Sequence, residues 1–354
     1  MMLDIVEILK EAVRRNASDV FITVGVPPML KVDGVLVRSG LSDDKLNPAD
    51  TQAVSERLMT RLRDIQAFQD SGECDFAMSL PEIGRFRVNA FNQRGSCAIS
   101  IRRIYLDLPD PEALRIPSVV LDLARLNRGL VLVTGPTGCG KTTTLAAIID
   151  KINRERACHV LTLEDPIEYL HRHNASIINQ REIGSDTLSY AAGLRAAMRE
   201  SPDVILIGEM RDLETISIAL TAAETGHLVL STLHTVGAAK TIDRIVDIFP
   251  PNQQQQIKVQ LSTVLQAVVS QQLIPSDRHG QVPAFEIMRA NGAIRNMIRE
   301  GKTPQIEGVM QMAGDQGMST MDLSLAALFK AGDISRSDAT HYAANPDGIQ
   351  RYLG

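Results

Sequence analysis

A glycine-rich segment that ends in lysine and threonine is the first feature of this sequence with recognisable chemistry. Residues 135–142 read GPTGCGKT and match the pattern G-x-x-x-x-G-K-[ST]. An apolar run, 130–134, precedes the segment, and a helical pattern, 142–153, follows it. Glycines let the backbone turn its N–H groups toward phosphate oxygens, and a helix N-terminus adds a partial positive charge. The segment therefore predicts a nucleotide site, with a glycine-rich turn that carries an incidental lysine as the alternative.

Two side chains of this loop have specific expected roles in a site for ATP and Mg²⁺. We expect the ammonium of Lys141 to reach the β- and γ-phosphates and the hydroxyl of Thr142 to bind Mg²⁺. The residues expected to contact the nucleotide are Gly135, Pro136, Thr137, Gly138, Cys139, Gly140, Lys141, Thr142 and Thr143. A thiol at Cys139 further suggests sensitivity to thiol reagents.

Acidic residues follow two other apolar runs. Glu209 comes after VILIG, with Gly208 where an aspartate is commoner, and we expect Glu209 to bind Mg²⁺ directly or through water. Glu164 and Glu168 lie in LTLEDPIE, and hydrolysis needs a group that orients or deprotonates water. Glu168 is the first choice for this base and Glu164 the second. The alternative is a solvated acidic loop.

Histidines and arginines complete the candidate set. His227 and His234 bracket an apolar strand, where a polar side chain can sense the γ-phosphate, although such histidines are usually core residues. Spacing among the seven histidines gives no metal motif, so no zinc is expected. Several arginines lie near two strands of the first hundred residues, either as sensors of phosphate or as a solvated basic face. They are Arg85, Arg87, Arg94, Arg102 and Arg103.

The elements that position these residues form an α/β protein in two parts. Residues 1–106 predict a small α+β domain with an antiparallel sheet and include one helix over 48–69. A proline-rich linker, 107–117, separates them from an ATPase domain, 118–354. In that domain apolar strands alternate with helices, which indicates a parallel sheet, and the pattern becomes mostly helical after residue 252. The expected strands are 130–134, 159–163, 204–207, 228–232 and 272–274.

Composition narrows the functional classes. The chain has 354 residues, a net charge of -5 and only 4% aromatic residues without tryptophan, which disfavours a nucleic-acid binder. Its apolar runs fall short of the roughly 20 residues of a membrane span, and the N-terminus lacks a signal-peptide pattern. The four cysteines form no CxxC pair, which fits a cytoplasmic protein without a four-cysteine zinc site.

Blocks along nearly the whole chain carry a family resemblance. They include GPTGCGKTTTLAAIIDKIN, LEDPIEYLH, PDVILIGEMRDLETI, AETGHLVLSTLHT and AIRNMIREGK. With them the chain resembles the secretion-type hexameric ATPases, and among these the type IV pilus retraction ATPases. The resemblance implies a PAS-like N-terminal domain and a RecA-like P-loop domain. It makes 164–168 the Asp box, Glu209 the Walker B acid, His227 and His234 the His box, and Arg87 and Arg102 the sensor arginines that reach the nucleotide.

The same resemblance implies a function and a setting. It implies a Mg²⁺-dependent ATPase that assembles as a hexameric ring and powers pilus retraction in twitching motility. The implied partners are an inner-membrane pilus platform protein and a paralogous pilus ATPase, at the inner face of the cytoplasmic membrane. Alternatives are an accessory retraction ATPase, another type IV pilus or type II secretion ATPase, and a RecA-type nucleic-acid motor. The extension and type II secretion relatives are longer and carry a four-cysteine zinc site, which this chain lacks.

Overall fold

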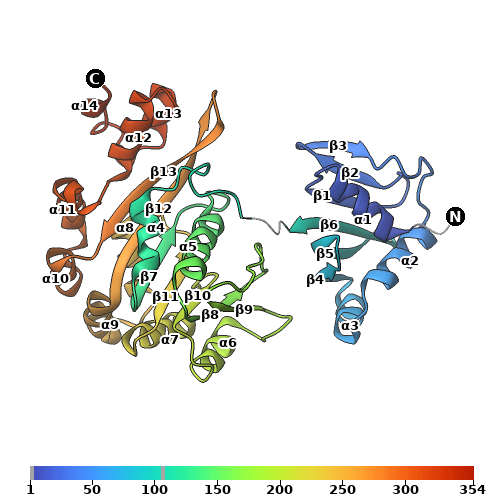
Figure 1. Ribbon diagram of the computed structural model, residues 1–354, viewed down its shortest axis with the longest axis horizontal. Helices are drawn as coiled ribbons and strands as arrows, with labels where there is room; N and C mark the ends of the chain where they lie inside the picture. The colour runs from blue at the N-terminus through green and yellow to red at the C-terminus, as the bar shows by residue number, and fades with distance from the viewer. Residues whose placement is uncertain (1–3, 105–107) are drawn as a thin grey trace. The chain divides into compact units, whose positions relative to one another are not determined.

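The computed structural model describes residues 4–104 and 108–354 (Figure 1). These residues divide into two compact units. The first unit contains the described residues up to 104 together with the short segment Glu168–Leu170. The second unit contains Leu108–Ile167 and His171–Gly354.

The first unit is a six-stranded antiparallel sheet with helices, as the sequence predicts. Its strands lie in the order β3-β2-β1-β6-β5-β4. Side chains alternate along the strands, so that Phe86, Val88 and Ala90 of β5 are buried while the residues between them face away from the core. The elements are α1 (Ile5–Arg14), β1 (Asp19–Ile22), β2 (Met29–Val32), β3 (Val35–Arg38), α2 (Pro48–Leu58), α3 (Leu62–Ser71), β4 (Glu73–Leu80), β5 (Gly84–Gln93) and β6 (Ser96–Ile104).

The single helix expected over 48–69 is wrong, because the chain forms α2 and α3 instead. Met59 and Arg61 adopt extended backbone conformations between the two helices. The break buries Leu58 and Met59 in the core of the unit. Neither glycine nor proline marks this break, so tertiary packing rather than a local signal ends α2.

The second unit contains a seven-stranded sheet in the order β13-β12-β7-β11-β10-β8-β9. All pairings are parallel except that of β12 with β13. The elements up to β11 are α4 (Ser118–Leu121), η1 (Asp122–Arg125), β7 (Gly129–Thr134), α5 (Lys141–Glu155), β8 (His159–Glu164), β9 (Ile177–Glu182), α6 (Tyr190–Ala197), β10 (Val204–Ile207), α7 (Leu213–Glu224) and β11 (Leu228–Leu233). The rest are α8 (Ala238–Asp247), α9 (Pro251–Val264), β12 (Leu265–Ser276), β13 (Gly280–Arg289), α10 (Gly292–Glu300), η2 (Thr303–Gln305), α11 (Ile306–Met312), η3 (Gly314–Gln316), α12 (Met321–Lys330), α13 (Arg336–His341) and α14 (Gln350–Leu353).

Both faces of the central strands are buried, which explains their continuous apolar runs. Along β7, Leu130 and Leu132 pack with residues of α6 to α11 on one face. Val131 and Val133 pack with α4 and α5 on the other face (Figure 1). The carboxyl ends of the parallel strands β7, β8, β10 and β11 therefore meet at one edge of the sheet.

No helix among the described residues is long and apolar enough to span a membrane.

Two parts of this sheet differ from the sequence expectations. The sequence does not predict strand β9, because IINQRE lacks a continuous apolar run. The expected strand 272–274 is only part of β12, which forms a long antiparallel hairpin with β13 where a mostly helical region was expected. Gln271 and Gln272 interrupt the apolar pattern of β12, and so conceal its length in the sequence.

Candidate functional site

The glycine-rich loop lies between β7 and α5, as its sequence context predicts. The φ angles of three loop residues are positive, which is unfavourable for residues other than glycine. These residues are Gly135, Gly138 and Gly140. Helix α5 has 15 residues and begins at Lys141 without a side-chain cap. The N–H groups of its first turn are therefore available to bind an anion such as phosphate.

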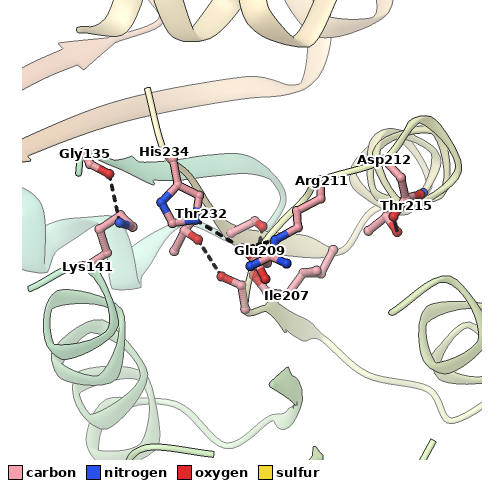
Figure 2. A network of polar contacts seen from close by, with 11 residues as sticks. Gly135, Lys141, Ile207, Glu209, Arg211, Asp212, Thr215, Thr232 and His234 are labelled. Atoms are coloured by element: carbon pink, nitrogen blue, oxygen red, sulfur yellow. Dashed lines mark hydrogen bonds and ion pairs between the residues drawn. The ribbon is translucent and has the colours of Figure 1, made fainter. Parts of the chain in front are cut away.

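The ammonium of Lys141 is held against the same loop (Figure 2). Its Nζ donates hydrogen bonds of 2.9 Å to the carbonyl oxygens of Gly135 and Pro136. Lys141 is only 8% exposed, so a buried cation lies directly beneath the curved backbone. This placement adds a full positive charge to the partial charge of the helix N-terminus.

Gln271 of β12 contacts the loop from the neighbouring strand, a role that no motif in the sequence predicts. The hydroxyl of Thr144 in α5 donates a 2.7 Å hydrogen bond to Oε1 of Gln271. A Cβ atom at Gly135 would lie 2.2 Å from the Gln271 carbonyl oxygen, and one at Gly140 would lie 2.8 Å from its Nε2. The contact at Gly135 is with backbone, so the loop can approach β12 this closely only because position 135 is glycine.

The carboxylate of Glu209 contacts an arginine and a histidine at the carboxyl edge of the sheet (Figure 2). Its Oε2 lies 2.7 Å from Nε of Arg211 and 3.2 Å from Nε2 of His234. Glu209 follows β10 and His234 follows β11, which is the strand between β10 and β7. The network thus extends from Glu209 through His234 toward the loop at Gly135. The hydrogen bond to Glu209 raises the pKa of Arg211, so this guanidinium stays charged.

Two further side chains of the Glu209 region fix the backbone. The hydroxyl of Thr232 in β11 donates a 2.6 Å hydrogen bond to the carbonyl oxygen of Gly208. Asp212 caps α7 by accepting a 2.8 Å hydrogen bond from the N–H of Thr215 (Figure 2). These contacts hold the turn that carries Glu209, and they assign Asp212 a structural task.

The second acidic segment contributes Glu164 to the same edge. Glu164 ends β8, is 7% exposed, and accepts hydrogen bonds from Thr162 at 2.6 Å and Gln180 at 3.1 Å. Tyr190, at the start of α6, is half-buried near Glu164 and two other acids. Burial raises the pKa of its hydroxyl, and the carboxylates of Asp165, Glu209 and Glu164 raise it further. The sequence offered no signal for Tyr190.

His227 lies at the opposite edge of the sheet from His234. Its Nδ1 lies 2.9 Å from the carbonyl oxygen of Ala222, near the end of α7. At about 3.3 Å per residue, strand β11 separates the two histidines by roughly 20 Å. Of these two histidines, His234 lies at the phosphate-loop edge and His227 does not.

The expected sensor arginines, Arg87 and Arg102, and the acid Glu168 belong to the first unit. Arg87 and Arg102 are direct cross-strand neighbours on β5 and β6. Arg87 pairs with Asp75 through two guanidinium nitrogens, and Nε of Arg102 lies 3.0 Å from Asp19. These aspartates offset the repulsion between the two facing cations. Glu168 is exposed in the segment that groups with this unit.

Cys139 differs from the expectation of a reactive thiol. Its side chain is 3% exposed inside the loop, and burial raises the pKa of the thiol. Because the thiolate is the reactive form, both effects lower its reactivity near neutral pH. Of the other residues expected around the phosphates, Pro136, Thr137 and Gly138 are exposed, and Thr142 and Thr143 are half-buried.

A cavity of about 410 Å³ opens beside the start of α5. Gly140, Thr143 and Thr144 line it on the loop side, and residues 113–116 line it elsewhere. Arg115 is anchored there by Asp333 at 2.8 Å and by Nε2 of His279 at 2.8 Å. A volume of this size suits a small organic ligand next to the phosphate loop.

Comparison with known proteins identifies the family. Residues 2–316 match the model of the family described as "Type II/IV secretion system protein". The chain belongs to this family. One relative within it, the type IV pilus retraction ATPase PilT of Pseudomonas aeruginosa, is 46% identical over 98% of this chain and all of its own length. Another, the twitching motility protein of Neisseria gonorrhoeae, is 47% identical over 91% of this chain and 86% of its own.

A solved structure of this family supports the same assignment. The crystal structure of the pilus retraction motor PilT with bound ADP has 47% sequence identity, covers 99% of both chains and aligns with a TM-score of 0.92. The predicted α/β fold and the predicted resemblance to the retraction ATPases are therefore confirmed. The chain is a homologue of PilT.

Proposed function

We propose that this chain is an ATP-hydrolysing ring motor that powers type IV pilus retraction and thereby twitching motility. The observation that carries the proposal is the shared edge of the sheet. There the uncapped N-terminus of α5, Lys141 and the Glu209–His234 pair lie on adjacent strand ends. Similarity to PilT over the full length supports the coupling of this site to retraction.

The residues present fit ATP and Mg²⁺. Lys141 and the N–H groups of the loop would hold the phosphates, and the cavity beside Thr143 would hold the base and sugar. Thr142 and Glu209 supply the hard oxygen ligands that Mg²⁺ prefers. The buried hydroxyl oxygen of Thr134, at the end of β7, has no hydrogen-bond partner among the described residues, which also fits a polar ligand at this edge. Bound Mg²⁺ would offset the negative charge of the phosphates.

The catalytic roles follow from exposure and pairing. We assign water activation to Glu168, which is exposed, ahead of Glu164, whose carboxylate is buried and hydrogen-bonded. His234 would transmit the state of the γ-phosphate to Glu209. Arg87 and Arg102 would be the sensor arginines, and His227 would complete the His box.

We propose a homohexameric ring at the cytoplasmic face of the inner membrane, in contact with the pilus platform protein and with a paralogous pilus ATPase. Residues 1–106 and 118–354 would be its two domains and 107–117 the linker. Residues 110–116 of that linker already form internal hydrogen bonds, including one from the Leu114 N–H to the carbonyl of Asp110.

ATP hydrolysis by the purified full-length chain tests the enzymatic part. We expect turnover with Mg²⁺, loss of turnover with EDTA, and no stimulation by DNA or RNA. The low aromatic content and the net charge of -5 are the reasons to expect no effect of nucleic acid. Absence of Mg²⁺-dependent turnover, or strong stimulation by DNA, would overturn the proposal.

A further inference from the structure

The hydroxyl of Tyr190 occupies the space above Gly208. A Cβ atom added at Gly208 would lie 2.9 Å from the Tyr190 hydroxyl, 3.3 Å from the Leu163 carbonyl oxygen and 3.5 Å from Cα of Glu164. Gly208 itself is bound to both neighbouring strands, because its N–H donates to Leu163 at 2.8 Å and its carbonyl accepts from Thr232. The hydroxyl therefore lies between the ends of β8 and β10, where the acids Glu164 and Glu209 stand.

The packing of α6 brings Tyr190 to this position. Ser189 caps the helix by accepting a hydrogen bond from the Ala192 N–H, so Tyr190 is its first residue. One turn later, a Cβ atom at Gly193 would lie 2.8 Å from a methyl group of Leu163. The glycine thus lets α6 approach β8 closely enough for the ring of Tyr190 to extend over the strand end.

The surroundings of the hydroxyl are acidic. Asp165, Glu209 and Glu164 lie near it, together with the cation Arg211. The tyrosine hydroxyl offers an O–H donor among these charged side chains.

We propose that Tyr190 is a positioning residue for hydrolysis, acting through Glu209 and Glu164, because its hydroxyl fills the gap above Gly208 and fixes the acidic ends of β10 and β8. This inference rests on the proposed ATPase function. It also explains why position 208 is glycine: the tyrosine hydroxyl takes the space that a side chain at 208 would occupy. A small displacement of catalytic groups can slow a reaction strongly, so loss of this spacer should affect turnover more than binding.

The conservative variant Tyr190→Phe removes the hydroxyl and retains the ring. We expect kcat for ATP hydrolysis to fall about tenfold, with KM for ATP within about twofold and the melting temperature nearly unchanged. Tyr352→Phe, in α14 of the C-terminal part, is the matched control and should retain wild-type kcat. Equal kcat in wild type and Tyr190→Phe would overturn the positioning role, as would a change confined to KM.

A second pair of variants tests the geometry apart from catalysis. Gly208→Ala should lower the melting temperature by roughly 2–10 °C in the wild-type background, because the new methyl group meets the hydroxyl. The same substitution should cost clearly less in the Tyr190→Phe background. Equal losses in the two backgrounds would overturn the contact on which the inference depends. Absence of ATP hydrolysis by the wild-type chain would overturn the proposed function and the positioning role with it, whatever the melting data show.

Discussion

Gly135→Ala should damage the phosphate loop far more than Gly138→Ala, although both replace a glycine of the same loop. At Gly135 the new Cβ would lie 2.2 Å from the Gln271 carbonyl oxygen and 2.7 Å from Sγ of Cys139. At Gly138 no atom lies within 4 Å of the new Cβ. Gly138→Ala therefore incurs only the conformational cost of its φ of +80°, about 1–2 kcal/mol.

Gly135→Ala incurs a conformational cost, from its φ of +141°, and an overlap cost in addition. The overlap cannot relax easily, because Ser270, the neighbour of Gln271, pairs in register with Thr134, the neighbour of Gly135. Overpacking against such fixed backbone typically costs about 1–3 kcal/mol, which corresponds to a factor of about 5 to 150 in an equilibrium constant. In melting temperature this is roughly 2–10 °C beyond the effect of Gly138→Ala.

Thermal unfolding and titration with a fluorescent ADP analogue measure both consequences. We expect Gly135→Ala to melt lower than Gly138→Ala and to bind the analogue more weakly. Equal melting temperatures and equal affinities for the two variants would refute the argument that the loop is packed against β12 through Gly135.

Five further variants or conditions have expected outcomes. Lys141→Ala should abolish hydrolysis, whereas Glu209→Gln should still bind ATP without cleaving it. Phosphate release and nucleotide retention measure the two effects. Turnover in either variant would remove the role assigned to that residue. Arg87→Ala should slow hydrolysis without lowering the melting temperature. The side chains of Arg87 and Asp75 are 39% and 40% exposed, and such ion pairs contribute about 0.2–1 kcal/mol to stability. A large drop in melting temperature would make the arginine structural. In a Cys158→Ser background, iodoacetamide should inactivate the chain slowly at pH 7 and faster only well above pH 8.5, because burial raises the pKa of the Cys139 thiol. Rapid inactivation at pH 7 would contradict a buried thiol. Burial lowers the pKa of His171 from 6.5 to about 4, so between these pH values the unfolded state binds more protons and acid should destabilise the fold. Between pH 7 and pH 5, urea unfolding should show a smaller loss of free energy of unfolding for His171→Gln than for wild type. An equal loss would exclude His171 as a cause.

The parts of the fold with strong local patterns could be predicted from the sequence. The apolar runs before Gly135 and Glu209 give β7 and β10, because strands buried on both faces need apolar residues throughout. The phosphate loop was equally predictable, since its residue types and flanking elements are specified locally. The break between α2 and α3 was not, because the contacts that bury Met59 are distant in sequence.

The candidate site was only partly predictable for the same reason. Lys141 and Glu209 belong to motifs, whereas Tyr190 and Gln271 reach the site through helix packing and strand order. Gln271 lies 127 residues beyond Thr144, with which it forms a hydrogen bond. The positions of His227 and His234 at opposite edges follow from the length of β11. Their partners, Ala222 and Thr225 for His227 and Glu209 for His234, required the structure.

Deletion of the gene in its host, with surface pili and twitching scored in the same cells, tests most directly whether this chain is a retraction motor. We expect abundant surface pili together with loss of twitching, and restoration of twitching by the wild-type gene but not by the Lys141→Ala variant. Absence of pili would indicate extension instead of retraction. Normal pili with normal twitching would contradict a required retraction motor and favour an accessory or unrelated secretion ATPase.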